Sequence, residues 1–178
     1  MTPQLASIVV HTDKEHPVFG ACYWQYLEVP EQVTASGDGL TIRRTLLHRP
    51  AESDGVHAES VTAENPMRLG ERVTVRLVIG SDRELEYVHV KDPRAVAFEP
   101  VNIHERRGGN QGVWWVESPR DAAEHFFLNS LPQGTVIIEY DVYVTQTGAF
   151  SHAPATIECM YAPDHRAQSN GERVTVGR

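Results

Sequence analysis

The sequence predicts an all-β fold, an antiparallel sandwich of about nine strands with at most one or two short helical turns. Short apolar runs recur along the 178 residues, often alternating with polar positions, whereas helical periodicity is nearly absent. Clusters of Gly, Pro, Asp and Asn separate these runs, as turns separate antiparallel strands. The length suits one compact unit, because typical domains have roughly 100 to 200 residues.

The clearest expected strand covers residues 71–79, where four apolar side chains alternate with polar ones and so share one face. Turn formers at 80–83 follow it, and residues 86–91 alternate again, so the pattern predicts a hairpin. Leu131-Pro132-Gln133-Gly134 suits a type I turn before the longest strand, residues 136–144. Further strands are expected at residues 19–28, 40–47, 112–117, 124–128, 155–161 and 172–176.

Helical turns are expected at two places only, residues 92–98 and 118–125. Each begins with Asp or Ser and has a proline beside it, as helix starts often do. Two polar stretches rich in turn formers, residues 49–65 and 106–111, predict loops.

The charge balance argues against nucleic acid and anionic membrane as partners. The chain has 24 acidic and 16 basic side chains, a formal net charge of −8, which repels polyanions. No window approaches the roughly 18 apolar residues of a membrane span, so no direct membrane insertion is expected. The first residues show no signal peptide, but a domain within a longer secreted protein would show none either.

Motifs for catalysis and for metal or cofactor binding are missing. The sequence has no Gly-x-Ser-x-Gly, no phosphate-binding loop, no His-Glu-x-x-His and no Cys-x-x-Cys, and its nine histidines are scattered. We therefore predict no catalytic residue, no metal site and no cofactor, and do not expect an enzyme. An active site assembled from scattered His and Asp residues is the alternative, and it would need a pocket with perturbed ionisable groups.

The two cysteines, Cys22 and Cys159, lie in apolar runs where buried free thiols are common, and a disulfide between them is the alternative. Cys22-Tyr23-Trp24-Gln25 has the Cys-x-x-Gln spacing of an internal thioester. A thioester ring needs a tight turn, whereas the bulky, β-prone Tyr and Trp favour an extended strand. We expect no thioester at this position.

Four stretches occur in the order ERVTVRLVI, DRELEYVHVKDPRAVAFEPVN, WWVESPRDAAEHFFLNSLPQGTVIIEYDVYVTQTGAFS and ATIECMYAPDHRAQSNGERVTV. Together they resemble the C-terminal macroglobulin-like domain of bacterial α2-macroglobulin-like proteins. The earlier stretch GACYWQYLE resembles the strand that leaves the thioester domain of those proteins. The resemblance implies an Ig-like macroglobulin sandwich at residues 36–178, preceded by an N-terminal segment, residues 1–35, that contains this exit strand.

The resemblance also implies a function. The parent would be a large protein of the periplasm or cell envelope that traps proteases after bait cleavage, although this chain contains no recognisable bait region. Its partners would be the thioester domain and neighbouring macroglobulin domains, with proteases met only indirectly. In bacterial relatives a Met-Tyr pair followed by x-Pro shields the thioester from water. Met160 and Tyr161, followed by Ala162-Pro163, match this pair.

Two other interpretations stay open from the sequence. Strand alternation could bury either Met160 or Tyr161 in the core, which would remove the shield. The chain could also be a free-standing cell-envelope binding or adhesion domain, with Trp114 and Trp115 as candidate contacts, although both tryptophans are expected in the core. A long exposed apolar edge at residues 19–26 would favour the docking module.

Overall fold

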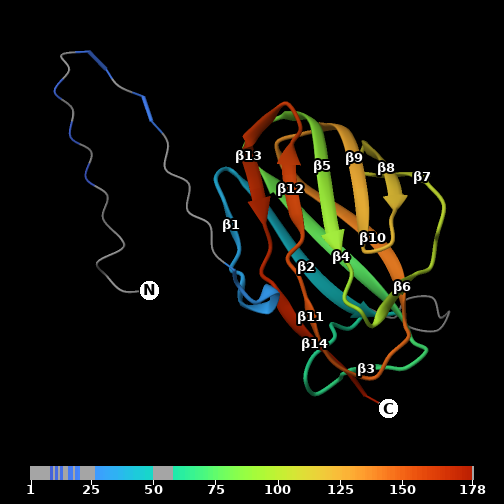
Figure 1. Cartoon of the computed structure of the whole chain (residues 1–178). Coiled ribbons are helices and arrows are strands. Elements are labelled where there is room, and N and C mark those ends of the chain that lie inside the picture. Colours follow the sequence, from blue (N-terminus) through green and yellow to red (C-terminus); the bar gives the residue numbers. More distant parts are fainter. Residues whose placement is uncertain are drawn as a thin grey trace.

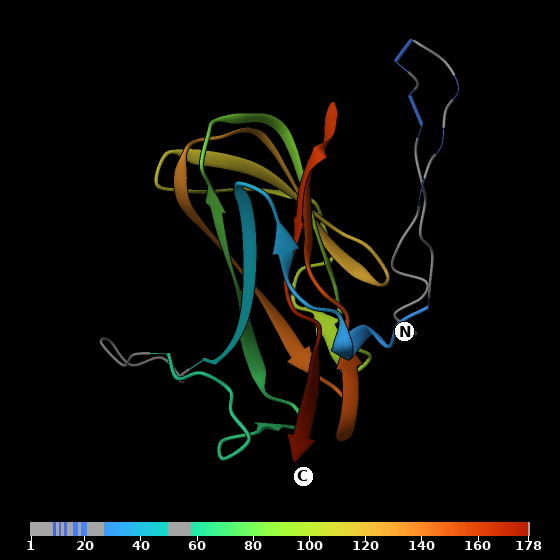
Figure 2. The ribbon, with the colours of Figure 1, turned by 90° about the vertical axis from the view of Figure 1, so that its left-hand side faces the viewer.

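The structure is a computed structural model that describes residues 27–49 and 58–177, together with positions 9, 11, 13, 16, 17, 19 and 20. Its strands form three sheets, and the two larger ones lie face to face (Figures 1 and 2). The seven-stranded sheet has the order β1 (Ser36–Gly37), β13 (Ala162–Gln168), β12 (Thr156–Cys159), β5 (Leu85–Pro93), β9 (Ala123–Leu131), β8 (Val113–Pro119) and β7 (Arg106–Asn110).

The second layer is a four-stranded sheet, and a three-stranded sheet lies at the end of the molecule near the C-terminus (Figure 1). Every pairing is antiparallel except that of β14 with β3. The four-stranded sheet has the order β2 (Leu40–His48), β4 (Arg72–Ser81), β10 (Gly134–Val144) and β6 (Phe98–Pro100), and the three-stranded sheet β11 (Gly148–His152), β14 (Glu172–Gly177) and β3 (Met67–Arg68). The predicted all-β sandwich is confirmed.

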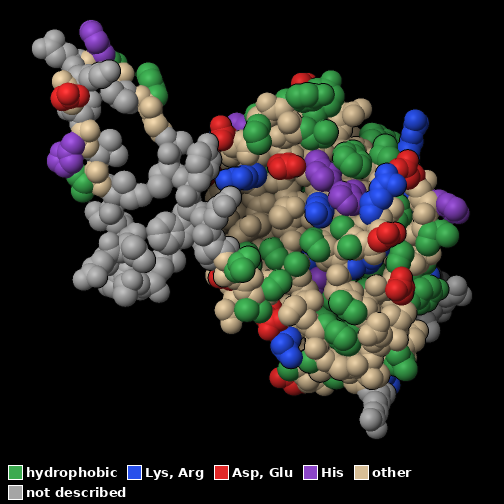
Figure 3. Space-filling view, viewed as in Figure 1, with side chains coloured by type: hydrophobic (Ala, Val, Ile, Leu, Met, Phe, Trp, Pro, Cys, Tyr) green, Lys and Arg blue, Asp and Glu red, His purple; other side chains and the backbone are tan. Residues whose placement is uncertain are grey.

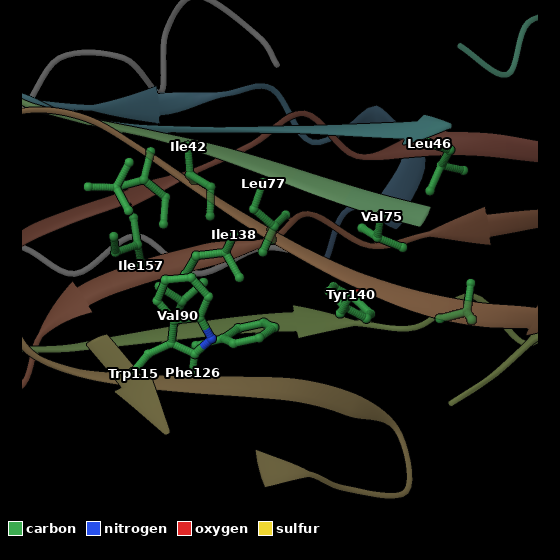
Figure 4. Close-up of a cluster of buried hydrophobic side chains, with 14 of the residues drawn as sticks. Ile42, Leu46, Val75, Leu77, Val90, Trp115, Phe126, Ile138, Tyr140 and Ile157 are labelled. Atoms are coloured by element: carbon green, nitrogen blue, oxygen red, sulfur yellow. The ribbon is translucent and has the colours of Figure 1, made fainter. Parts of the chain in front are cut away.

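Alternating apolar side chains from both layers form the core, as the sequence predicts (Figure 4). On β4 the expected inward residues are all fully buried: Val73, Val75, Leu77 and Ile79. From the opposite layer, Val90 and Phe126 are equally buried. Each such side chain contributes about 1.5 to 3 kcal/mol of hydrophobic free energy, so the alternation of these strands is the main stabilising pattern.

The predicted hairpin of residues 71–91 is wrong. Strand β4 pairs with β2 and β10, whereas β5 pairs with β12 and β9 in the other layer. Residues 82–84 therefore carry the chain across the sandwich, and residues 132–133 do the same between β9 and β10. Alternation identifies the buried face of a strand, but two strands that face one core from opposite layers show the same alternation as two paired strands.

Both predicted helical turns are also wrong. Strand β5 runs to Pro93 and β8 to Pro119, and tight turns rather than helices follow them. The Asp, Ser and Pro residues that suit a helix start suit a turn equally well. Among the described residues, the helical element is one 3₁₀ turn, η2 (Pro30–Gln32).

Several strands escaped prediction because they are short or polar. The predicted loop at 106–111 is largely β7, an edge strand of the seven-stranded sheet, in which Gly108 and Gly109 lie against the indole rings of Trp115 and Trp114. The loop predicted at 49–65 lies mainly outside strands where it is described, apart from a bridge between Ser60 and Leu47. The other strands not expected are β1, β3, β6, β11 and β13.

The N-terminal part of the chain leaves two predictions untested. Residues 21–26, the centre of the strand expected at 19–28, lie outside the described residues, as does the exposed edge expected there. The domain division at residues 35 and 36 stays a prediction. The turn η2 already contacts the sandwich, because Arg173 Nη1 lies 3.0 Å from Glu31 Oε1 and Gly171 N–H donates to the Val33 carbonyl at 2.8 Å.

A buried cation joins the three sheets. Arg44 on β2 reaches across the sandwich, where its Nη1 lies 2.6 Å from Asp92 Oδ1 on β5, and its Nε lies 2.8 Å from Glu172 Oε1 on β14. Tyr140 on β10 donates its hydroxyl to Asp92 Oδ2 at 2.9 Å. The side chains of Arg44 and Asp92 are only 1% and 0% exposed. Burial alone would lower the pKa of Arg44, but Asp92 and Glu172 outweigh it and raise that pKa.

We expect Arg44→Met to lower the free energy of unfolding by about 3 to 5 kcal/mol, because Asp92 would remain buried without its cation. Urea unfolding followed by tryptophan fluorescence measures the loss. The double variant Arg44→Met with Asp92→Asn removes the orphaned charge as well, so it should recover at least about 1 kcal/mol.

Arg76→Met is the matched control, because Arg76 pairs with Glu139 at 2.5 Å on the solvent side of the four-stranded sheet, where the two side chains are 41% and 44% exposed. Its cost should stay below about 1 kcal/mol. An Arg44→Met protein as stable as this control would contradict the role assigned to the buried pair.

Candidate functional site

The predicted shielding pair, Met160 and Tyr161, forms the turn between β12 and β13. Met160 is 51% exposed and Tyr161 79%, so the interpretation that alternation buries one of them is wrong. The reason is local: the register of β12 and β13 shifts between Glu158 and Cys159, and the alternation ends at the buried Cys159. Both side chains are therefore free to contact another surface.

A third residue, Tyr87 on β5, supports this turn. Met160 N–H donates to the Tyr87 carbonyl at 2.9 Å, and the rings of Tyr87 and Tyr161 meet edge to face with centroids 5.2 Å apart. Tyr87 has φ of 55°, in the left-handed region that costs a non-glycine residue about 1 kcal/mol or more. We call Tyr87, Met160 and Tyr161 the tip cluster. Sequence spacing gave no sign of Tyr87, which meets the pair only through sheet pairing.

The cysteines contribute no site in the described part of the chain. Cys159 is a buried free thiol whose Sγ lies 3.2 Å from the Glu86 carbonyl. Cys22, its candidate disulfide partner, lies outside the described residues, and so does the Cys22-to-Gln25 segment. Over the described ranges, no group of three or more His, Cys, Asp or Glu residues could hold a metal ion. No helix there is long and apolar enough to cross a membrane.

The solvent side of the seven-stranded sheet carries aromatic and histidine side chains. His89 Nε2 and His125 Nδ1 lie 2.9 Å apart, a hydrogen bond between β5 and β9, and the Phe127 ring stacks on His89 at 4.8 Å. Histidines gather near the middle of this face in Figure 3. The tryptophan prediction is half wrong: Trp115 is buried as expected, but alternation turns Trp114 outward, 72% exposed.

Two carboxylates inside the sandwich test the enzyme interpretation. Glu117 Oε2 lies 2.8 Å from Arg106 Nε, and Glu124 Oε2 lies 3.0 Å from Arg94 Nη1. Burial, reinforced by the nearby Glu117 charge and opposed by Arg94, raises the pKa of Glu124 to about 7. Burial also raises the pKa of Glu117, against the effect of Arg106. Both side chains are almost completely buried, so this arrangement holds strands together and presents no reactive group to a substrate.

Comparison with known proteins identifies the family. Residues 39–164 match the family described as "Bacterial Alpha-2-macroglobulin MG10 domain". The chain belongs to this family. The match extends from the start of β2 to within β13, so it includes Arg44, Asp92 and the tip cluster, whereas Glu172 on β14 lies beyond it.

Solved structures show the same fold for this MG10 domain. Salmonella alpha-2-macroglobulin reacted with methylamine is 22% identical, with a TM-score of 0.66 over 82% of this chain and 10% of that one. An Escherichia coli alpha-2-macroglobulin fragment from domain MG7 to the C-terminus is 18% identical, with a TM-score of 0.64 over 81% of this chain and 24% of that one.

A curated relative is the Circularly permutated Ras protein 2 of Dictyostelium discoideum, 27% identical over 139 residues. The match covers 78% of this chain but 4% of that protein. The MG10 domain thus spans only a small part of each of these relatives.

Glu124→Gln should make the MG10 domain more stable than the wild type at neutral pH. Between about pH 4.5 and 7 the unfolded chain releases the Glu124 proton while the folded protein keeps it, so the wild type loses stability as pH rises through this window. The variant lacks that loss, which we expect to be on the order of 1 to 3 kcal/mol. Urea unfolding at pH 4.5 and pH 8 measures it.

Glu139→Gln, at an exposed carboxylate, serves as the control. Its free energy of unfolding relative to wild type should show no comparable change between these pH values. If the difference in free energy of unfolding between Glu124→Gln and wild type stayed constant from pH 4.5 to 8, Glu124 would have an ordinary pKa. The raised pKa assigned to Glu124 would then be wrong.

Proposed function

We propose that this chain is a non-catalytic β-sandwich module of an alpha-2-macroglobulin-like protease-trapping protein, and that it docks against a thioester domain and shields the thioester. Met160 and Tyr161 are the shielding residues. The parent protein acts in the periplasm or cell envelope and inhibits endopeptidases, while this module meets proteases only indirectly. The observation that carries the proposal is an exposed Met-Tyr turn on a member of the MG10 family.

The chemistry of the tip cluster suits a shield. A thioether is polarizable and adapts to an irregular surface, and a tyrosine ring covers apolar atoms while its hydroxyl finds a hydrogen-bond partner. Tyr87 holds the turn through a backbone hydrogen bond and an edge-to-face ring contact. Because the turn is already ordered, docking costs little conformational entropy.

The mechanism is docking and release. Bait cleavage elsewhere in the parent would change the contacts of this module, withdraw the tip cluster and open the thioester to nucleophiles. Related proteins have been studied after such treatments: the Salmonella protein was reacted with methylamine, and the E. coli protein was activated by trypsin or by porcine elastase. The module itself forms and breaks no covalent bond.

A second candidate function is a free-standing cell-envelope binding or adhesion domain. The exposed Trp114 favours it, because a solvent-facing indole on a sheet is a common contact for a partner. This candidate predicts that the chain acts without a thioester domain beside it. The first check is therefore whether the native gene, or its neighbour, encodes a thioester domain.

The shield is tested in the complete product of the native gene. Replacing both residues, Met160→Ala with Tyr161→Ala, should increase the rate of thioester hydrolysis before any protease is added, by about tenfold or more if the tip excludes water. The released cysteine thiol is followed with a chromogenic thiol reagent, and reaction with methylamine gives a second readout.

The matched control replaces two exposed apolar residues elsewhere in the domain, Leu69→Ala with Val96→Ala, and should leave hydrolysis unchanged. Hydrolysis at the wild-type rate in the Met160 and Tyr161 double variant would contradict the shielding role of these residues. The absence of any thioester in the native product would do the same and favour the free-standing domain.

A further inference from the structure

Two rows of outward side chains cross the seven-stranded sheet. Strand register places them opposite one another from β7 to β1, and we call this solvent-facing surface the outer face (Figure 3). The first row is Arg107, Val116, Phe127, His89, Glu158 and Arg166. The second row is His125, Lys91, Thr156, Gln168 and Ser36.

Large apolar side chains of the outer face are exposed. Val116 and Phe127 are opposite each other on β8 and β9, and Trp114 lies two residues along β8 from Val116. On β5, Tyr87 is also exposed, two residues from His89, and its carbonyl accepts a hydrogen bond from the turn at Met160. Clustered exposed apolar side chains on a soluble domain mark an interaction site.

The two rows of the outer face carry more cations than carboxylates, on a chain that is negative overall. The rows contain Lys91, Arg107 and Arg166 but one carboxylate, Glu158, whereas the chain has a formal net charge of −8. A hollow of about 470 Å³ lies on this face, and its charged lining consists of two cations, Lys91 and Arg166, and one carboxylate, Glu158. Such a hollow suits a carboxylate from a partner, because charge complementarity selects the partner and fixes its position.

The exposed apolar side chains of the outer face, Trp114 and Phe127, are held by neighbouring residues of this domain. The indole of Trp114 lies on the backbone of Gly109, where a methyl group would be 2.7 Å from Trp114 Cε3. Phe127 stacks on His89, which is hydrogen-bonded to His125. Side chains fixed in this way lose little freedom on binding.

We infer that the outer face docks a neighbouring folded domain of the same polypeptide, whose contact surface has an apolar centre and a carboxylate-rich rim. In the relatives described above, the matched region makes up 4% to 24% of the chain, so those proteins contain further polypeptide beside it. The inference goes beyond the proposed shield, because it requires neither a thioester nor the side chains of Met160 and Tyr161.

Cysteine labelling of the complete native gene product tests this inference. Phe127→Cys reports the outer face, and Glu139→Cys is the matched control on the solvent side of the four-stranded sheet, since Phe127 is 38% exposed and the Glu139 side chain 44%. Maleimide labelling is quantified by peptide mass spectrometry, which separates each site from other cysteines. We expect Phe127→Cys to react at least about tenfold more slowly, because its exposure then requires undocking. Val116→Cys repeats the measurement if Phe127→Cys fails to fold.

Charge reversal tests the acidic rim. Combining Lys91→Glu and Arg107→Glu with the labelling site should bring its rate to within about twofold of the control, because like charges would oppose docking. If labelling remained slow after charge reversal, the inference that the partner surface has a carboxylate-rich rim would be wrong. Equal rates at the outer face and the control would overturn docking altogether. Protection that increases with protein concentration would identify a second copy as the occupant and overturn the neighbouring domain. These results are independent of the hydrolysis rate that tests the shield.

Discussion

The ion pair between Arg44 and Asp92 is the interaction on which the arrangement of the layers depends. Apolar side chains favour any close approach of two sheets, and they tolerate small sliding movements. A buried guanidinium, in contrast, donates its hydrogen bonds in fixed directions and so fixes the positions of its partners. Since Arg44 also contacts Glu172, and Asp92 accepts from Tyr140, strands from all three sheets are positioned relative to one charged group. The strand that carries Asp92 is β5, which also carries Tyr87 and His89 on its other face.

Strand β5 therefore connects the interior with the surface that we propose to act. Val88, Val90 and Asp92 face the core, while His89 and Lys91 face solvent. The left-handed residue Tyr87 interrupts this alternation at the end of the strand next to the β12–β13 turn. The ion pair between Arg44 and Asp92 fixes β5 on its core side, so the outer face on the other side of β5 keeps its shape without a partner. Docking can then depend on complementary charge and apolar contact, with little rearrangement of this domain.

Much of the fold was predictable from the sequence because alternation is a local property: β2, β4 and β10 were all expected near their observed positions. Pairing was not predictable, since β4 and β5 bury apolar residues toward one core from different layers. The polar strand β13 has no alternation strong enough to detect. For the site, Met160 and Tyr161 followed from family resemblance, but Tyr87 and the bond between His89 and His125, 36 residues apart, arise only from sheet register.

Strand β7 couples solubility to the proposed contact surface. It lies at the edge of its sheet, where exposed backbone groups invite pairing with other chains, and its short, glycine-containing sequence with two arginines discourages this. The same two glycines lie against the indoles of Trp114 and Trp115, so a side chain at either position would displace a ring. A substitution at Gly108 or Gly109 that made this edge strand more prone to pair with other chains would therefore also disturb the packing of the tryptophans. Selection against aggregation at the edge thus also preserves the proposed contact surface, and selection for that surface preserves the edge.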